Sequence, residues 1–80
     1  MQSIMRNQVI ELGKKLKDRR EILHLLQQQL AVLAEVSVRT IQLVERGEGN
    51  PSLQTLIQLA DPLGLRLEFT INEPLQTPGP

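Results

Sequence analysis

The sequence predicts a small, mainly α-helical domain that ends in a single β-strand. Apolar residues recur at helical spacing over most of the chain, whereas residues 65–72 alternate between apolar and polar side chains, as in a strand with one buried face. A length of 80 residues suits one domain. We expect a flexible N-terminus over residues 1–6, the helical domain over 7–64, the strand over 65–72 and a disordered tail over 73–80.

Composition excludes several classes of protein. The chain has no cysteine and one histidine, which rules out disulfides and leaves no set of soft ligands for a metal. Phe69 is its only aromatic residue, which argues against a binder that stacks single-stranded bases. No apolar run approaches the roughly 20 residues of a membrane span, and the first residues lack the order of a signal peptide. We therefore expect a cytoplasmic protein that has no cofactor, metal or membrane contact. Because no catalytic arrangement is recognisable, we also expect that it is not an enzyme.

Charge is balanced over the whole chain but not along it. Nine basic and nine acidic residues give a net charge of zero, which is unusual for a DNA-binding domain. The first quarter of the chain, however, is mostly basic: Arg6, Lys14, Lys15, Lys17, Arg19 and Arg20 stand against Glu11 and Asp18. A phosphate-facing side can therefore exist, although a run of lysines is more often a solvated helix face.

The first half of the chain predicts two helices. Apolar residues recur at helical spacing from about Asn7. After Leu23 they crowd too closely for one amphipathic face, and we expect a break near His24–Leu26. A single helix over residues 7–36 is also physically reasonable, because nothing between Leu23 and the end of this stretch is a glycine or proline.

A short, capped helix follows. Ser37 is a good N-cap, and Gly47 supplies a left-handed residue that commonly closes a helix. Ile41 and Val44 share one face and are expected to point inward. The outward side chains are free to meet a ligand: Val38, Arg39, Gln42 and Arg46. This is the shape of a recognition helix, which enters the DNA major groove.

The last part predicts a turn-rich loop, a further helix and the strand. Ser52 caps the further helix, and Asp61-Pro62 stops it. The strand would bury one face made of Leu65, Leu67, Phe69 and Ile71. No second strand is recognisable, so the backbone N–H and C=O groups of the predicted strand need a partner elsewhere. We expect the same strand of a second copy in a homodimer, and the sheet edge of another protein is the alternative.

Taken together, the pattern Gln27-x-x-Leu30-Ala31-x-x-Ala34-x-Val36-Ser37-x-x-Thr40-Ile41-x-x-x-Glu45-Arg46-Gly47, followed by Asn50-Pro51-Ser52-Leu53-x-Thr55-Leu56, resembles the Cro/C1-type (XRE) helix-turn-helix family. The resemblance implies a five-helix-type, lambda-repressor-like domain that binds double-stranded DNA at an inverted-repeat operator as a repressor. With the appended strand, the chain looks like the HipB-type antitoxins. These are homodimers with paired C-terminal strands that regulate their own operon and hold a HipA-type kinase toxin, so a HipA-like partner is implied.

The resemblance also implies a set of DNA-binding residues: Gln27, Ser37, Val38, Arg39, Thr40, Gln42, Arg46 and Asn50. Arg39 is the best candidate for reading guanine, because its guanidinium can donate two bonds to that base. Val38 would touch a thymine methyl, and Gln42 would read adenine or reach a phosphate. Phosphate contacts are expected for Gln27, Thr40 and Asn50. Ser37 mainly caps its helix, and Arg46 either contacts DNA or pairs with Glu45, for which a structural role is expected.

Three positions depart from the family pattern. His24 and Glu35 stand where the family often has glycine, and Leu26 stands where it often has a capping Thr or Ser. These departures put the entry to the second helix, and so the pose of Gln27, in question. The alternative function is a helical protein-interaction module without DNA binding, which the neutral net charge favours and in which residues 7–36 form one helix.

Overall fold

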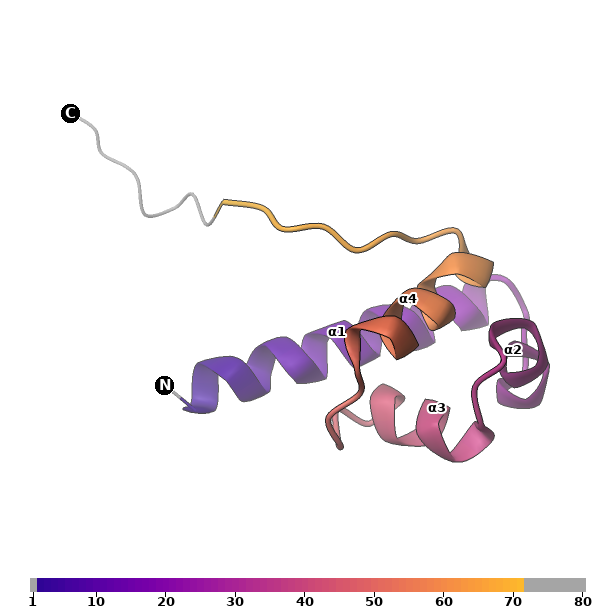
Figure 1. Cartoon of the computed structure of the whole chain (residues 1–80), viewed down its shortest axis with the longest axis horizontal. Helices are drawn as coiled ribbons and strands as arrows, with labels where there is room; N and C mark the ends of the chain where they lie inside the picture. Colours follow the sequence, from indigo (N-terminus) through magenta and orange to yellow (C-terminus); the bar gives the residue numbers. More distant parts are fainter. Residues whose placement is uncertain (1, 72–80) are drawn as a thin grey trace.

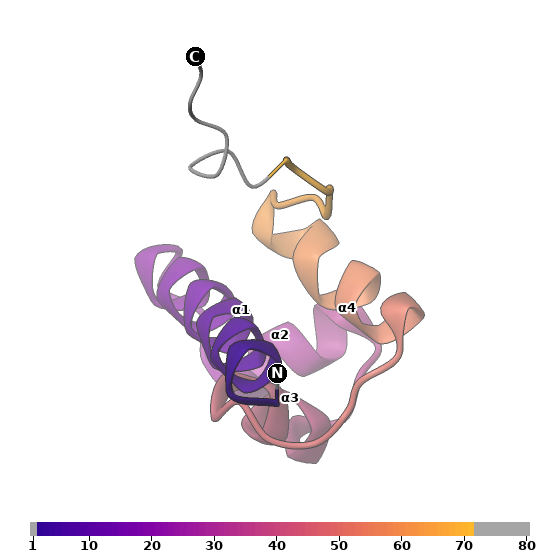
Figure 2. The same ribbon diagram turned by 90° about the vertical axis from the view of Figure 1, so that its left-hand side faces the viewer.

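The computed structural model describes residues 2–71, with side chains from residue 6 onward, and shows a bundle of α-helices (Figure 1). The elements are α1 (Gln2–Ile22), α2 (Gln27–Ala34), α3 (Val38–Glu45), α4 (Leu53–Ala60) and the short 3-10 helix η1 (Asp61–Leu63). α3 packs against α1 and α2, whereas α4 and η1 pack against α2, and η1 also meets α1. Seen from the side in Figure 2, α3 and α4 therefore lie on different sides of the bundle.

The helix boundaries confirm the predicted break and correct three other expectations. α1 ends at Ile22 and α2 begins at Gln27, so the alternative of one helix over residues 7–36 is wrong. The flexible end over residues 1–6 is wrong from Gln2 onward, because α1 starts there and no glycine or proline precedes Gly13. In place of a fifth α-helix, the described chain has only η1, since Pro62 lacks an amide donor and Gly64 turns left-handed.

No strand forms over the described part of residues 65–72. Residues 65–71 follow η1 and form neither helix nor strand (Figure 1). A strand needs a neighbouring strand for its backbone hydrogen bonds, and a single copy does not supply one. Leu65 and Leu67 are half-buried, but Phe69 is 103% exposed and Ile71 is 83% exposed. The predicted pairing of this segment between two copies stays a prediction, and the predicted tail over 73–80 lies outside the described residues.

All four helical segments end in the same left-handed turn. In each turn, a backbone N–H donates a hydrogen bond to the carbonyl oxygen of the residue five positions earlier. The four bonds run from Leu25 N–H to Arg20 O at 3.0 Å, from Val36 N–H to Ala31 O at 3.1 Å, from Glu48 N–H to Leu43 O at 2.8 Å, and from Leu65 N–H to Ala60 O at 3.0 Å. The left-handed residue is Gly47, as predicted, in the turn after α3, and it is Gly64 in the turn after η1. It is His24 (φ 58°) and Glu35 (φ 57°) at the other two, where an L side chain is strained.

A small apolar core holds the helices together. It consists of Leu16, Leu30, Ala34, Ile41, Val44, Leu59 and Leu63, all at most 5% exposed. At its edge, α1 and α3 approach so closely that only glycine fits at position 13, because a Cβ there would overlap the carbonyl oxygen of Val44. The C-terminal end of α3 is therefore pressed directly onto the backbone of α1.

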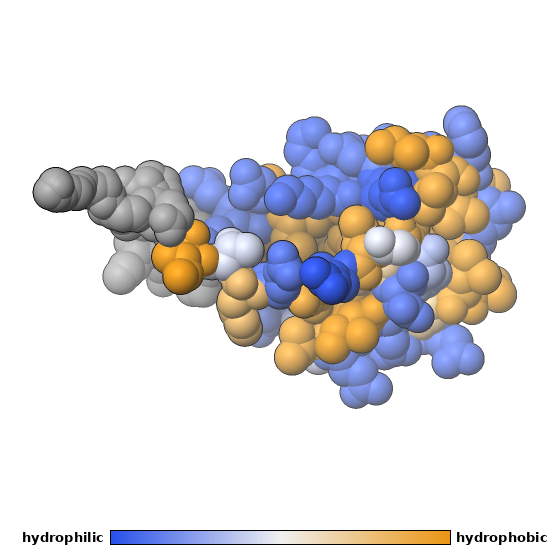
Figure 3. Space-filling model, turned by 90° about the horizontal axis from the view of Figure 1, so that it is seen from above, coloured by the Kyte–Doolittle hydropathy of each residue, from blue (hydrophilic) through white to orange (hydrophobic). Residues whose placement is uncertain are grey.

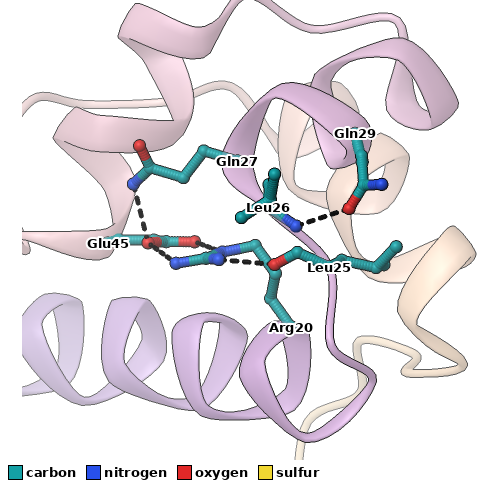
Figure 4. A network of polar contacts seen from close by, with 6 residues as sticks. All are labelled: Arg20, Leu25, Leu26, Gln27, Gln29 and Glu45. Carbon is teal, nitrogen blue, oxygen red and sulfur yellow. Dashed lines mark hydrogen bonds and ion pairs between the residues drawn. The ribbon is translucent and has the colours of Figure 1, made fainter.

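A buried polar network joins the first three helices (Figure 4). Arg20 donates from Nε to Glu45 Oε2 at 2.6 Å and from Nη2 to Glu45 Oε1 at 2.9 Å, and the two side chains are only 9% and 5% exposed. Arg20 Nη1 also donates to the carbonyl oxygen of Leu25 at 2.7 Å, in the turn that ends α1. Gln27 donates from Nε2 to Glu45 Oε1 at 3.0 Å. One ion pair thus fixes α3, the first turn of α2 and the end of α1.

The buried pair stabilises Arg20 in its charged form. The hydrogen bonds from Arg20 to Glu45 raise the pKa of the Arg20 guanidinium above its ordinary value, and the lowering by burial is the smaller effect. Arg20 therefore stays charged although it is buried.

Glycine at the two strained turns should stabilise the fold. We expect Glu35→Gly and His24→Gly each to raise the free energy of unfolding by about 0.5–1 kcal/mol, because a left-handed L residue costs about 1–2 kcal/mol and glycine loses about 0.5–1 kcal/mol in extra chain entropy. Urea unfolding followed by circular dichroism measures this. The control is Lys15→Gly, at an exposed right-handed position of α1, which should destabilise. A loss of stability in Glu35→Gly would contradict the left-handed turn.

Breaking the buried ion pair should be more costly than replacing it. Arg20→Met or Glu45→Leu alone leaves one buried charge without its partner, which we expect to lower the free energy of unfolding by about 3–5 kcal/mol. The double variant Arg20→Met, Glu45→Leu buries no charge and should recover much of this loss. Unfolding of all three variants in urea gives the comparison. If the double variant loses as much as the two single losses added, the two side chains are not coupled as the geometry indicates.

Candidate nucleic-acid interface

The N-terminal end of α3 is tightly capped. Thr40 donates its backbone N–H to Ser37 Oγ at 3.1 Å, and the Ser37 hydroxyl donates to Thr40 Oγ1 at 2.9 Å. Ser37 is thus the N-cap that the sequence predicts. The Thr40 hydroxyl accepts one bond and keeps its own hydrogen for a further acceptor.

The two faces of α3 are clearly separated. Ile41 and Val44 are 1% and 5% exposed and face the core. Arg39 is fully on the surface, in the first turn of α3, and makes no ion pair among those found in residues 2–71. The other predicted outward residues are half-buried (Val38, Thr40, Gln42) or exposed (Ser37, Arg46). The structure therefore places all the predicted contacts of this helix where a ligand can reach them.

The end of α3 is held against α1. Gly47 has φ 73°, and a Cβ at this position would press on Ile10 of α1. Glycine is needed here both for the left-handed turn and for the close approach. α3 is thus fixed at both ends, by the Ser37 cap and by the contact of Gly47 with α1.

A polar hollow of about 270 Å³ opens beside α3 where three helices meet. It is lined by Lys17 from α1, Gln27 from α2, and Gln42, Glu45 and Arg46 from the end of α3. The Gln27 side chain turns inward to Glu45 (Figure 4), and the phosphate contact expected of this residue stays a prediction.

The basic residues of the first quarter have different uses. Arg20 is buried in its pair, and Arg19 donates from Nε to the carbonyl oxygen of Leu63 at 2.8 Å. Lys14 pairs with Asp18 at 3.1 Å on the open surface of α1. The expected phosphate-facing side is therefore narrower than the number of basic residues indicates. Among the basic residues of the first quarter of the chain, only Lys17 lines the hollow beside α3.

Two further residues of this surface, Leu43 and Lys17, were not predicted individually as contacts. Leu43 is half-buried and lines a second hollow of about 180 Å³ with Thr40 and the predicted contact Asn50, which is exposed. Its signal in the sequence is its spacing of four residues from Arg39, which puts both on one helix face. Lys17 had no local signal, since only the packing of α1 against α3 brings it to this surface.

Other kinds of site are not seen in the described part of the chain. Residues 2–71 contain no group of three or more His, Asp or Glu side chains arranged to hold a metal ion. Within the same range, no helix has the length and apolarity needed to cross a membrane.

Known proteins share this arrangement. An uncharacterised HTH-type transcriptional regulator of Haemophilus influenzae is 39% identical over 60 residues, which are 75% of this chain and 61% of that protein. The present chain thus spans less than two thirds of this relative. The crystal structure of the restriction-modification controller protein C.AhdI from Aeromonas hydrophila superimposes with a TM-score of 0.70 at 30% identity, over 75% of this chain and 91% of the controller.

A model of the helix-turn-helix family matches residues 16–69, which span α2, the capped α3 and the turn between them. This match covers well over half of the 80 residues, and it includes the buried pair and the outward face of α3. The chain therefore belongs to the helix-turn-helix family.

Proposed function

We propose that this chain is a sequence-specific, DNA-binding transcriptional repressor that works as a homodimer in the cytoplasm and is not an enzyme. The observation that carries the proposal is the division of α3 into a buried apolar face and an outward polar face led by Arg39. A helix held in this way can enter a major groove with its N-terminal residues toward the bases. Membership of the helix-turn-helix family supports the same function.

Three basic side chains fit the phosphates beside such a groove. Lys17 and Arg46 flank the polar hollow at the end of α3, and Arg39 stands at its start. Arg46 is only loosely engaged, since its Nε lies 3.6 Å from Glu48 Oε1 on an exposed surface. Such a weak pair can exchange its carboxylate for a phosphate at little cost.

The dimer and its partner form the narrower part of the proposal. The exposed Phe69 and Ile71 continue the apolar alternation of Leu65 and Leu67, and pairing of this segment with that of a second copy would satisfy its backbone and cover these side chains. Two copies would then read an inverted repeat with their recognition helices roughly 34 Å apart. Pairing of this segment would also fit a HipB-like antitoxin that regulates its own operon and neutralises a HipA-like kinase.

A second candidate role is that of a controller of a restriction-modification operon. It is favoured by the likeness to C.AhdI, which extends over 91% of that protein. Both roles need the same DNA-binding surface and differ in the neighbouring gene. A kinase-like reading frame beside this one favours the antitoxin, and a methyltransferase or endonuclease frame favours the controller.

Arg39→Ala should separate base reading from charge. We expect it to weaken binding to the DNA upstream of this reading frame by about 1–3 kcal/mol, with little effect on random DNA. Fluorescence anisotropy over a series of salt concentrations gives both affinities. Lys15→Ala is the matched control, because it removes one positive charge from an exposed side chain of α1 that lies outside α3 and outside the segment over residues 65–72. Equal losses on both DNAs would mean that Arg39 supplies only charge, and no salt-dependent binding at all would favour the interaction module.

Phe69→Asp should remove the pairing of the C-terminal segments. We expect the molar mass measured by light scattering to fall to half of the wild-type value, because a carboxylate replaces the largest apolar side chain of the paired face. Since Phe69 is fully exposed in the single chain, the helical circular dichroism should not change. Gln54→Asp, on the exposed face of α4, adds the same charge elsewhere and should keep the wild-type mass. An unchanged mass for Phe69→Asp would contradict the pairing.

A further inference from the structure

An apolar side chain lies beside Arg39 on the outward face of α3. Leu43 is half-buried, whereas the apolar residues of the inner face, Ile41 and Val44, are 1% and 5% exposed. Leu43 follows Arg39 by four residues, and residues at this spacing are neighbours on one helix face. The face proposed to enter the major groove therefore carries an apolar group next to its leading arginine.

The position of Leu43 is fixed by the loop after α3. Its carbonyl oxygen accepts a hydrogen bond from the Glu48 backbone N–H at 2.8 Å. Its side chain lies against the same loop, since a Cβ added at Gly49 would be 3.7 Å from Leu43 Cβ and 3.9 Å from Leu43 Cδ1. The rest of the side chain lines the hollow of about 180 Å³ that opens beside α3. Leu43 is thus supported from behind and accessible from outside.

Exposure alone does not assign a role to this leucine. Apolar side chains are also exposed on the face of the molecule away from α3, which Figure 3 shows from above, and Phe69 and Ile71 are examples. Leu43 differs from these because it stands on the same helix face as the residue proposed to read a base. The question is therefore which group of the DNA a leucine can recognise there.

The chemistry of leucine leaves one such group. Its side chain has no hydrogen-bond donor or acceptor, so it gains nothing from a phosphate or from the polar edge of a base. The apolar group of the major groove is the 5-methyl group of thymine. 5-Methylcytosine carries the same group at the same ring position. Burial of one methyl group against an apolar side chain corresponds to about a fourfold gain in affinity.

The spacing also fixes the place of this methyl group relative to the base read by Arg39. Residues four apart on a helix have Cβ atoms roughly 5–6 Å apart. Successive base pairs are about 3.4 Å apart along the duplex. Leu43 would therefore meet a pyrimidine within about two base pairs of the guanine that Arg39 bonds.

We propose that Leu43 reads the 5-methyl group of a pyrimidine close to that guanine, so that the affinity for DNA depends on the methyl group. This inference rests on the proposed DNA-binding function and names a feature of its target. The methyl group belongs either to thymine or to 5-methylcytosine. In the second case, methylation of the DNA would itself regulate binding by this chain.

Removing or adding methyl groups on the DNA tests the proposal. The probe is the DNA upstream of this reading frame in three forms: unmodified, with deoxyuridine in place of thymidine, and with 5-methyldeoxycytidine in place of deoxycytidine. Fluorescence anisotropy gives the affinity of each form for the wild type, Leu43→Ala and the control Ile57→Ala. Ile57 is 51% exposed on α4, on a different side of the bundle, and its replacement removes the same number of carbon atoms.

The response of each protein to the modified probes is the quantity to compare. A Leu43-dependent loss of about fourfold per contacted methyl group on the deoxyuridine probe assigns thymine. A Leu43-dependent gain of the same size on the 5-methyldeoxycytidine probe assigns 5-methylcytosine. Ile57→Ala should respond as the wild type does. If Leu43→Ala also responds to both modified probes as the wild type does, the proposal is overturned.

Two controls separate the methyl contact from other effects. Changes in DNA stiffness and methyl contacts of Val38 act equally on the wild type and Leu43→Ala, so they cancel in the comparison of responses. Leu43→Gln keeps the length of the side chain, and it should lose the same response as Leu43→Ala while keeping the helical circular dichroism of the wild type.

The same measurements distinguish this inference from the proposed function. Salt-dependent binding of the wild type to the upstream DNA with no Leu43-dependent response to methyl groups would overturn the inference alone. Absence of salt-dependent binding by the wild type to all three probes would refute the repressor function and the inference together.

Discussion

The structure depends on one buried ion pair between α1 and α3. Arg20 and Glu45 are far apart in the sequence, yet each lies where a helix ends, and their bidentate contact holds those ends together. The same two side chains also bind the turn after α1 and the first residue of α2. Each of the two buried side chains takes part in three hydrogen bonds, which offset the cost of burying their charges.

The orientation of α3 follows from this constraint. The pair and Gly47 fix its C-terminal end against α1, where Gly13 allows the backbones to touch. Ser37 fixes the other end by its cap. Ile41 and Val44 are buried in the core on the inner face of this short helix, so its outward side chains occupy defined positions. Preorganisation of this kind lowers the entropy lost when a ligand binds.

Local signals in the sequence were enough to predict α3 but not its surroundings. Ser37 and Gly47 identify the ends of the helix, because caps act over a few residues. Nothing near Arg20 or Gly13 reveals that Glu45 and Val44 will lie against them, since such contacts arise only from the packing of distant helices. The two strained turns were found only as departures from a family pattern. The predicted pairing of residues 65–72 would involve a second copy, so the structure of a single chain does not test it.

The neutral net charge of the chain is compatible with a DNA-binding face because charge is felt locally. Glu45 is the last residue of α3, but its buried carboxylate is paired with Arg20. It therefore contributes little to the electrostatic field at the surface. The basic residues on the surface around α3 are Lys17, Arg39 and Arg46. Glu48 is the acidic residue that pairs with Arg46 there. Two of the remaining acidic residues, Asp61 and Glu68, lie in η1 or beyond it, on the other side of the bundle from α3 (Figure 1). Because exposed charges separated by more than about 10 Å are largely screened at moderate salt, these acids do not cancel the positive side of α3. The composition of the whole chain is therefore a weaker guide to its ligand than the charge on one face.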